Sequence, residues 1–553
     1  MTEICAPSPN PLRPASQIMK LDVMGASFPT RLSFLRRLIR ALAAENSRVT
    51  RPVWNIDAEG YGHAVYSVTL GGHTYSLVAF AQELPPEMRT DRVIATAWDA
   101  AFVLYDGVPD TAEIARLGDN APLQEAGRMG PKDLVLSRAN KSVRLFAEVT
   151  QALKEGCQPD TDAIAKIGYL MRTTAVYGNG KFGLADRSAF SDRAVMNGPF
   201  AAEMLAVWLI RGFTHDLIEH VGGGELDRHL KRHLGIGNST GLGMAPFLVS
   251  HPLLLNNWVL ARESALADCV AEAALDAAGR ARVAELAHRV ERHLAQWNVP
   301  DEAYQDRIAK LRCEWVHFQA FLQAGWRNEM PFAGLMGYQS QDQTIDAELH
   351  ELIAALVLEA NPEIVDPYSD CMDCDLNLVT RGLQDCQALF DQMTDQLAWA
   401  LEIDFSDPKE VHQFWYVSEE KQEPRLGVRA QEDGAELESP LDIARRIQAF
   451  YRDLGGFDGA LGDFLMSAPQ HLFIARRVQA ALAFPYTEIQ DNLIGDKCLP
   501  IDMLRFKLAM FGASKFDPKS DRWTRITLAQ GAPLFDELDR ADADDWWLPV
   551  FET

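Results

Sequence analysis

Two strand-like runs joined by a pair of glycines constrain the fold most strongly. The runs cover residues 63–70 and 73–80, and Gly71 and Gly72 link them. Glycine adopts a positive φ without strain, so a two-glycine link suits the tight turn of a β-hairpin. The sequence therefore predicts a hairpin here, as the centre of a small antiparallel sheet.

Further elements are expected on either side of the hairpin. Strand-like runs at 53–56 and 92–105 would extend the sheet, and an Arg-rich amphipathic helix at 30–45 would pack on one of its faces. From residue 137 onward, apolar residues recur at helical spacing. The predicted helices cover residues 138–155, 160–173, 199–220, 252–277, 279–297, 301–325, 344–359, 376–401 and, as a group, about 440–511. A strand-like run at 411–417 interrupts them.

The predicted fold class is α+β and mainly α-helical, with a small antiparallel N-terminal sheet packed on a helix and then a large helical body. Three domains are expected. Residues 1–120 form an α+β lobe, and residues 121–335 form a helical domain that carries two glycine-rich loops. Residues 336–553 form a mainly helical C-terminal region that ends in an acidic tail.

Charge and composition limit the classes of partner. The 53 Lys and Arg residues face 78 Asp and Glu residues, which gives a formal net charge of −25. Such a chain repels nucleic acid phosphates and anionic lipids, so neither a nucleic-acid nor a membrane partner is expected. The eight cysteines are scattered, and no apolar run is long enough to span a membrane. We expect a soluble cytoplasmic protein, with a homo-oligomer left open; an organelle presequence at 30–45 is the alternative.

The first glycine-rich loop, residues 177–183, fits the pattern G-x-G-x-x-G at Gly178, Gly180 and Gly183. The dinucleotide fingerprint needs a strand before the glycines and a helix opening at them. Because a helix is predicted before this loop, no Rossmann-type nucleotide site is expected. The loop is interpreted instead as an anion cradle made by backbone amides, with ligand-binding residues Arg172, Asn179, Gly180 and Lys181. An ordinary Asn-Gly turn is the structural alternative.

The second glycine-rich loop, residues 234–243, contains Gly237-Asn-Ser-Thr-Gly241. This fits G-x-S-x-G, the nucleophile elbow of α/β-hydrolases, which needs an apolar strand before the serine. The preceding residues are charged and helical in pattern, so Ser239 as a nucleophile is an alternative hypothesis. A second interpretation makes Asn238, Ser239, Thr240 and Gly241 part of a ligand site. The structural alternative is a helix C-cap at Gly235 followed by a turn.

Two further clusters suggest a metal or a thiol site. Glu225, His229 and His233 are spaced four residues apart, so on one helix they would share a face and could hold a divalent metal. Cys371 and Cys374 form a C-x-x-C pair, which suits a redox pair or half of a metal site. Neither cluster has the companion residues of a complete motif.

The sequence favours an enzyme over a scaffold. Its function is expected to be catalysis on a small anionic metabolite, carboxylate- or phosphate-bearing, bound between the 172–187 and 235–251 loops. His215 or His251 would act as general base. The alternatives are a metal- or thiol-dependent oxidoreductase that uses the 215–233 region or the Cys371/Cys374 pair, a serine hydrolase with Ser239, and a non-enzymatic helical interaction protein.

Overall fold

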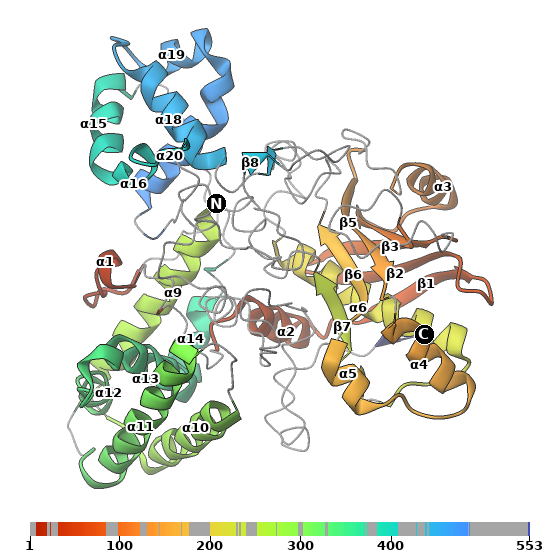
Figure 1. Ribbon diagram of the computed structural model, residues 1–553, viewed down its shortest axis with the longest axis horizontal. Helices are drawn as coiled ribbons and strands as arrows, with labels where there is room; N and C mark the ends of the chain where they lie inside the picture. The colour runs from red at the N-terminus through yellow and green to blue at the C-terminus, as the bar shows by residue number, and fades with distance from the viewer. Residues whose placement is uncertain are drawn as a thin grey trace.

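A computed structural model gives the structure of the chain. It describes residues 7–18, 23, 31–83, 98–121, 130–142, 144–167, 169–175, 200–227, 230–231, 234–238, 252–272, 274–296, 302–326, 330–369, 371–372, 384–406, 427–428, 437–438, 442–484, 486 and 551–552. Within these residues the fold is α+β and mainly α-helical, as the sequence predicts. A large sheet lies on one side of the molecule and helices form the other side (Figure 1).

The sheet has eight strands in the order β10-β1-β2-β3-β4-β5-β6-β7. Strands β1 to β6 pair with one another in antiparallel fashion. At the two ends of the sheet, β7 runs parallel to β6 and β10 runs parallel to β1. The strands are β1 (Val49–Ile56), β2 (Gly62–Leu70), β3 (His73–Ala81), β4 (Ala100–Asp106), β5 (Asp133–Lys141), β6 (Tyr169–Ala175), β7 (Gly235–Asn238) and β10 (Phe551–Glu552). A separate two-stranded sheet pairs β8 (Gly427–Val428) with β9 (Leu437–Glu438).

The predicted hairpin is confirmed as β2 and β3. Leu70 pairs with His73 across the turn, and Gly71 and Gly72 have φ values of 61° and 72°. Both turn residues are therefore in the left-handed region, where a side chain would be strained. The two glycines thus fix the register of the hairpin.

Helices cover both faces of the sheet. Alternate residues such as Tyr66 and Phe102 belong to the core that the sheet shares with α2 (Phe34–Ala44) and α6 (Phe200–Gly222). The intervening residues, including Val65 and Val103, form a second core with α3 (Thr111–Asn120). Because successive side chains of a strand point to opposite faces, one alternating strand supplies both cores.

The helical body consists of two groups. The first comprises α9 (Pro252–Ala271), α10 (Ala277–Gln296), α11 (Glu302–Ala324), α12 (Pro331–Met336), α13 (Asp346–Ala360) and α14 (Pro362–Ser369). The second has its own core and comprises α15 (Cys386–Gln396), α16 (Ala398–Leu401), α18 (Asp442–Leu454), α19 (Leu461–Ser467) and α20 (Leu472–Ala483). Shorter elements are α1 (Ala15–Ile18), α4 (Leu145–Lys154), α5 (Thr161–Ile167), η3 (Gln343–Ile345) and η4 (Pro469–His471).

Two of the predicted helices are partly wrong. The helix predicted at 138–155 begins as the end of strand β5, and only α4 is helical. The helix predicted at 160–173 divides into α5 and strand β6. Strand β5 is buried on both faces along almost its whole length, so its sequence has no clear alternation to separate it from a buried helix.

Other predictions agree with the structure or concern residues that the structure does not describe. The helices predicted at 199–220, 279–297 and 301–325 correspond to α6, α10 and α11. The predicted run 411–417 lies outside the described residues. The sheet extends past residue 120 through β5, β6 and β7, while the three-domain division itself remains a prediction.

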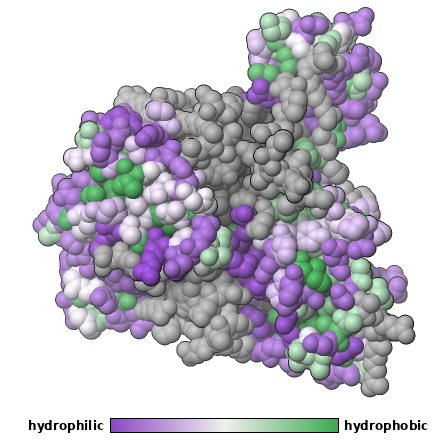
Figure 2. All heavy atoms as spheres, turned by 180° about the vertical axis from the view of Figure 1, so that it is seen from behind, coloured by the Kyte–Doolittle hydropathy of each residue, from purple (hydrophilic) through white to green (hydrophobic). Residues whose placement is uncertain are grey.

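The described surface carries few large apolar residues. Figure 2 shows a mainly hydrophilic face with small separate apolar areas. The large hydrophobic side chains exposed within the described ranges are Val108, Val316, Met330, Met466 and Leu472. No helix among the described residues combines the length and the apolar character that a membrane crossing requires.

A buried ion network joins the N-terminal segment to the helical body. Arg13 contacts Glu263 on α9 at 2.6 Å and Glu351 on α13 at 2.9 Å. Arg262 contacts the same two carboxylates at 2.8 and 2.5 Å. The side chains of Arg262, Glu263 and Glu351 are nearly inaccessible, so each charge depends on its partners for compensation. Although burial opposes ionisation, the two arginines keep the pKa of Glu351 below its usual range.

Breaking this network by one partner is expected to destabilise the fold. Arg262→Met leaves Glu263 and Glu351 buried with Arg13 alone, and we expect the free energy of unfolding to fall by about 3 kcal/mol, because removal of one member of a buried ion pair strands a charge. Urea unfolding of both proteins measures the difference. The matched control is Arg452→Met, at a side chain that is 75% exposed, where a change below about 0.5 kcal/mol is expected. An equal fall in the free energy of unfolding in the two variants would contradict a stabilising role of the buried ion network.

A second contact of the N-terminal segment predicts a pH dependence. Asp268 on α9 accepts hydrogen bonds from Ser8 Oγ, from Asn10 Nδ2 at 2.9 Å and from Tyr368 OH. Burial opposes its charge, but the three donors outweigh burial and lower the pKa of Asp268. A carboxyl whose pKa is lower in the folded state stabilises the fold above its unfolded pKa, and this contribution is lost as the pH falls through the folded pKa.

Asp268→Asn should therefore lower the free energy of unfolding at pH 7, and the difference from the wild type should shrink below about pH 4, near the ordinary aspartate pKa. Urea unfolding from pH 7 to pH 3 tests this. A difference that stays constant over the range would show that the charge of Asp268 is not the cause.

Candidate functional site

The structure brings the starts of the two glycine-rich loops together. Strand β6 leads into the first loop, whereas β7 forms the first part of the second, which was expected as a loop over residues 234–243. The two strands are parallel neighbours, with Arg172 opposite Gly237 and Thr173 opposite Asn238. Both loops therefore leave the sheet at the carboxyl ends of these two adjacent parallel strands. We call this place the β6–β7 edge. In open α/β sheets, ligands bind beyond the carboxyl ends of parallel strands, and β6 and β7 form such a parallel pair in this mainly antiparallel sheet.

Helix α6 makes this parallel pairing possible. Parallel neighbours need a crossover connection, and α6 supplies it between β6 and β7. Its residue Phe213 is fully buried and packs edge-on against Phe102 of β4 and Tyr66 of β2, with ring centroids 5.7 and 6.4 Å apart. These contacts hold the crossover helix against the central strands of the sheet (Figure 1).

Close packing against α4 fixes the carboxyl-terminal end of α6. A Cβ on Gly222 would lie 2.7 Å from the Cβ of Leu153, so the glycine lets α6 approach α4 closely. Six residues before the end of α6, Asp216 accepts hydrogen bonds from Tyr66 OH at 2.6 Å and from Arg51 Nη1 at 2.8 Å. Burial and the Asp216 carboxylate raise the pKa of Tyr66, so the phenol stays protonated and remains a donor.

Two buried side chains of α6 attach the chain where it enters β7. Arg211 Nε donates to the Leu234 carbonyl oxygen at 3.0 Å, and Arg211 Nη2 donates to the carbonyl of Lys231. His215 Nε2 also donates to the Leu234 carbonyl, at 2.9 Å. Burial, together with the charge of Arg211, lowers the pKa of His215 far below its usual value, so the ring is neutral. A neutral ring with its proton on Nε2 suits this role as a donor.

This placement gives His215 a different position from the one predicted. As a general base it was expected beside the loops, whereas it lies at the amino end of β7, enclosed by protein and bonded to the backbone. The loops leave from the opposite end of that strand. We therefore regard His215 as an anchor of β7 and leave it out of the proposed site.

The other predicted site residues are described only in part. Arg172 and Asn238 are placed by their backbone in β6 and β7. The remaining residues of the predicted loop site lie outside the described residues: Asn179, Gly180, Lys181, Ser239, Thr240, Gly241 and His251. The register of β6 and β7 thus shows that the two loops start side by side. Whether the loops form one site remains a prediction.

The glycine fingerprint also needs a partial correction. A strand, β6, precedes Gly178, where the sequence predicted a helix. The parallel unit β6–α6–β7 therefore supplies half of the dinucleotide-binding context. The glycines themselves, Gly178, Gly180 and Gly183, lie outside the described residues, and β7 ends in Asn238 in place of an acidic residue.

The predicted metal and thiol clusters are only partly described. Glu225 is exposed beyond the end of α6, and its backbone oxygen accepts a hydrogen bond from Gln158 Nε2 at 2.9 Å. His229 and His233 lie outside the described residues, as does Cys374. Cys371 follows α14 and belongs to a disulfide bond. Within the described ranges, no group of three or more His, Cys, Asp or Glu side chains is placed to hold a metal ion.

The anchoring of β7 by Arg211 predicts a local effect. Arg211→Met removes two hydrogen bonds to the backbone before β7, each from a charged donor, and we expect a loss of about 2 kcal/mol. Hydrogen exchange should become faster in peptides that cover residues 234–238. The increase in the exchange rate should be smaller in peptides from the β2–β3 hairpin. Arg452→Met serves as the matched control. Uniformly faster exchange over the whole sheet would argue against a specific anchor.

Comparison with known proteins gives no further information about this site. No model of a protein family matches the chain, and neither a curated protein nor a solved structure matches it. The functional assignment therefore rests on the β6–β7 edge, its crossover helix and the residues that the sequence places in the two loops.

Proposed function

We propose that the protein is an enzyme that acts on a small anionic metabolite bound beyond the carboxyl ends of β6 and β7. The observation that carries the proposal is the parallel register, in which Arg172 is opposite Gly237 and Thr173 is opposite Asn238. It makes the two glycine-rich loops neighbours at their starting points. Glycine-rich loops suit an anion, because successive backbone N–H groups in such a loop can form a concave anion-binding nest.

The residues of the loops provide the chemistry of the proposed site. Arg172 and Lys181 would neutralise a carboxylate or a phosphate group, and a guanidinium matches the oxygens of either in a two-pronged contact. Asn179, Asn238 and Thr240 would orient the rest of the metabolite. Gly180 and Gly241 would let the backbone approach it closely.

Catalysis would use groups that sit beside the bound anion. His251 is the general base in this proposal, since His215 anchors β7. Ser239 would donate a hydrogen bond to the substrate. The acidic composition supports a small substrate over a polyanion, and we place the enzyme in the cytoplasm.

Ligand binding tests the proposal directly. We expect carboxylate- or phosphate-bearing metabolites, but not their neutral analogues, to raise the thermal unfolding temperature, because a ligand that binds only the folded state stabilises it. Lys181→Ala should weaken binding by about tenfold, since a hydrogen bond to a charged group contributes about 1.5–3 kcal/mol. Ser239→Ala should weaken binding or reduce turnover of the same metabolite.

The matched control is Lys154→Ala, at an exposed lysine that ends α4. This variant should bind as the wild type does. If Lys181→Ala and Ser239→Ala both leave binding and turnover unchanged, the proposed site is wrong.

A further inference from the structure

One disulfide bond joins Cys371 to a cysteine outside the described residues. The remaining described cysteines are free thiols: Cys157, Cys269, Cys313 and Cys386. The chain has eight cysteines, and those that the structure does not describe are Cys5, Cys374 and Cys498. The partner of Cys371 is therefore one of these three.

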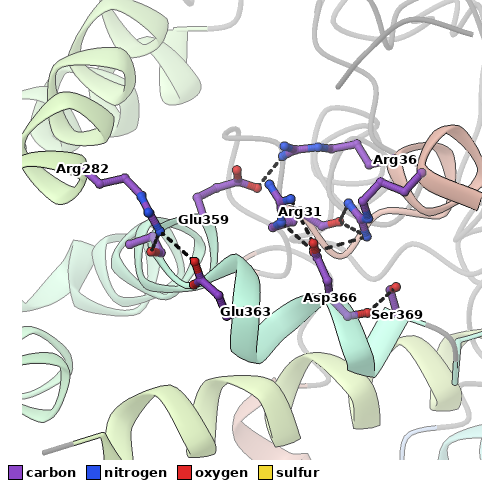
Figure 3. Close-up of polar contacts among 9 residues, drawn as sticks. Arg31, Arg36, Arg282, Glu359, Glu363, Asp366 and Ser369 are labelled. Carbon is purple, nitrogen blue, oxygen red and sulfur yellow. Dashed lines mark hydrogen bonds and ion pairs between the residues drawn. The ribbon is translucent and has the colours of Figure 1, made fainter. Parts of the chain in front are cut away.

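Cys371 lies just beyond the end of α14, a helix that polar contacts fix in place. Arg31 Nε binds Asp366 of this helix at 2.6 Å, and Ser369 Oγ donates to the Asp366 carbonyl oxygen at 2.6 Å (Figure 3). The backbone N–H of Cys371 donates to the Tyr368 carbonyl oxygen at 3.2 Å. Side chains three residues apart in such a turn project in similar directions. Cys371 is therefore placed on the side of the turn that carries Tyr368.

The side of α14 that carries Tyr368 faces the N-terminal segment, residues 7–18. Tyr368 OH and Ser8 Oγ donate to the two oxygens of one carboxylate, that of Asp268 on α9. The Ser8 backbone N–H also donates to Ser264 Oγ at 3.2 Å. The N-terminal segment and the end of α14 therefore meet at Asp268.

Cys5 is within reach of this meeting point. It precedes Ser8 by three residues, which span at most about 10 Å of extended chain. Cys371 follows Tyr368 by the same number of residues. The Cα atoms of a disulfide bond are about 4.4–6.8 Å apart, so both spacings suit a bond between the two cysteines.

Cys374 is the competing partner, since it forms a C-x-x-C pair with Cys371. A reactive thiol is favoured at the amino end of a helix, where the positive end of the helix dipole stabilises the thiolate. Cys371 instead follows the carboxyl end of α14, and acidic residues flank the pair in the sequence. This setting is unsuited to a reactive C-x-x-C pair, whereas a bond to Cys5 uses the side of the turn that faces the N-terminal segment.

The thiol beside Asp268 does not compete for this bond. Cys269 follows Asp268 directly, and it is fully buried and free. Burial, together with the charge of Asp268, raises the pKa of Cys269 to about 12, so it stays a protonated thiol at neutral pH. Because the thiolate is the form that attacks a disulfide, Cys269 leaves the bond of Cys371 intact.

We propose that a disulfide bond between Cys5 and Cys371 cross-links the N-terminal segment to the end of α14 and makes the attachment of this segment sensitive to redox state. A dithiol reduces the bond: the S–S bond breaks, each sulfur gains one electron and one proton, and the dithiol becomes a cyclic disulfide. The reduced protein then holds the segment by non-covalent contacts, among them those of Ser8 and Arg13. This device is independent of the site proposed at the β6–β7 edge.

Peptide mapping of the full chain identifies the pairing. The protein is equilibrated with oxidised glutathione, its free thiols are alkylated, and it is digested without reductant by a protease that cleaves at Asp373, which separates Cys371 from Cys374. Mass spectrometry should find one pair of peptides joined through Cys5 and Cys371. A Cys371 peptide joined to Cys374 or Cys498, or alkylated as a free thiol, would overturn the proposal.

Hydrogen exchange and thermal unfolding test the role of the bond. Reduction of the wild type with dithiothreitol should make exchange in peptides covering residues 8–13 about tenfold faster or more, and it should lower the unfolding temperature, because a cross-link that closes a long loop restricts the unfolded chain. Cys5→Ser in oxidising buffer should match the reduced wild type in both measurements and should not respond to dithiothreitol. If Cys5→Ser does not fold, reduction of the wild type makes the same comparison without a substitution.

Two further serine variants serve as controls. Cys157→Ser removes an exposed free thiol and should behave as the wild type does in either buffer. Cys374→Ser should keep the bond and the slow exchange of residues 8–13. Loss of the bond in Cys374→Ser, with the bond kept in Cys5→Ser, would overturn the pairing. Unchanged exchange of residues 8–13 on reduction of the wild type would overturn the role in attaching the segment.

Discussion

The packing of α6 against the sheet is the constraint on which the rest of the structure depends. A parallel neighbour for β6 requires a connection that returns across the face of the sheet, and α6 makes this return with Phe213 buried against Phe102. Arg211 and His215 of the same helix then fix the point at which β7 begins. Helix α6 thus contributes side chains to the core beneath the sheet and connects β6 to β7. It also fixes the position of β7 beside β6, from which the two loops start.

Local chemistry made part of this fold predictable. The hairpin follows from two strand-like runs and from two glycines between them that accept a positive φ, and long helices such as α6 and α11 follow from apolar spacing and length. Strand β5 could not be predicted in this way, because burial on both faces removes the alternation that marks a strand. Strand β7 is short and contains two glycines, so only its pairing with β6 makes it a strand.

The candidate site was predictable to a similar degree. Glycine and polar residues indicated the two loops, but their proximity depends on a pairing between residues far apart in sequence, which no local pattern encodes. The role of His215 was missed for the same reason, since its partner is the backbone of Leu234. A usable signal did exist for the ion network, because Arg262 and Glu263 interrupt an otherwise apolar part of α9. A charged pair in such a run indicates buried partners elsewhere.

The N-terminal segment has a consequence for how the chain is made. Ser8 and Arg13 find their partners 250 to 338 residues later in the sequence, on α9 and α13. During synthesis, the ribosome must therefore produce most of the first helical group before these contacts can form. Until then Ser8 and Arg13 lack these partners. The segment is thus made well before its partners and can settle only after α13 has been made.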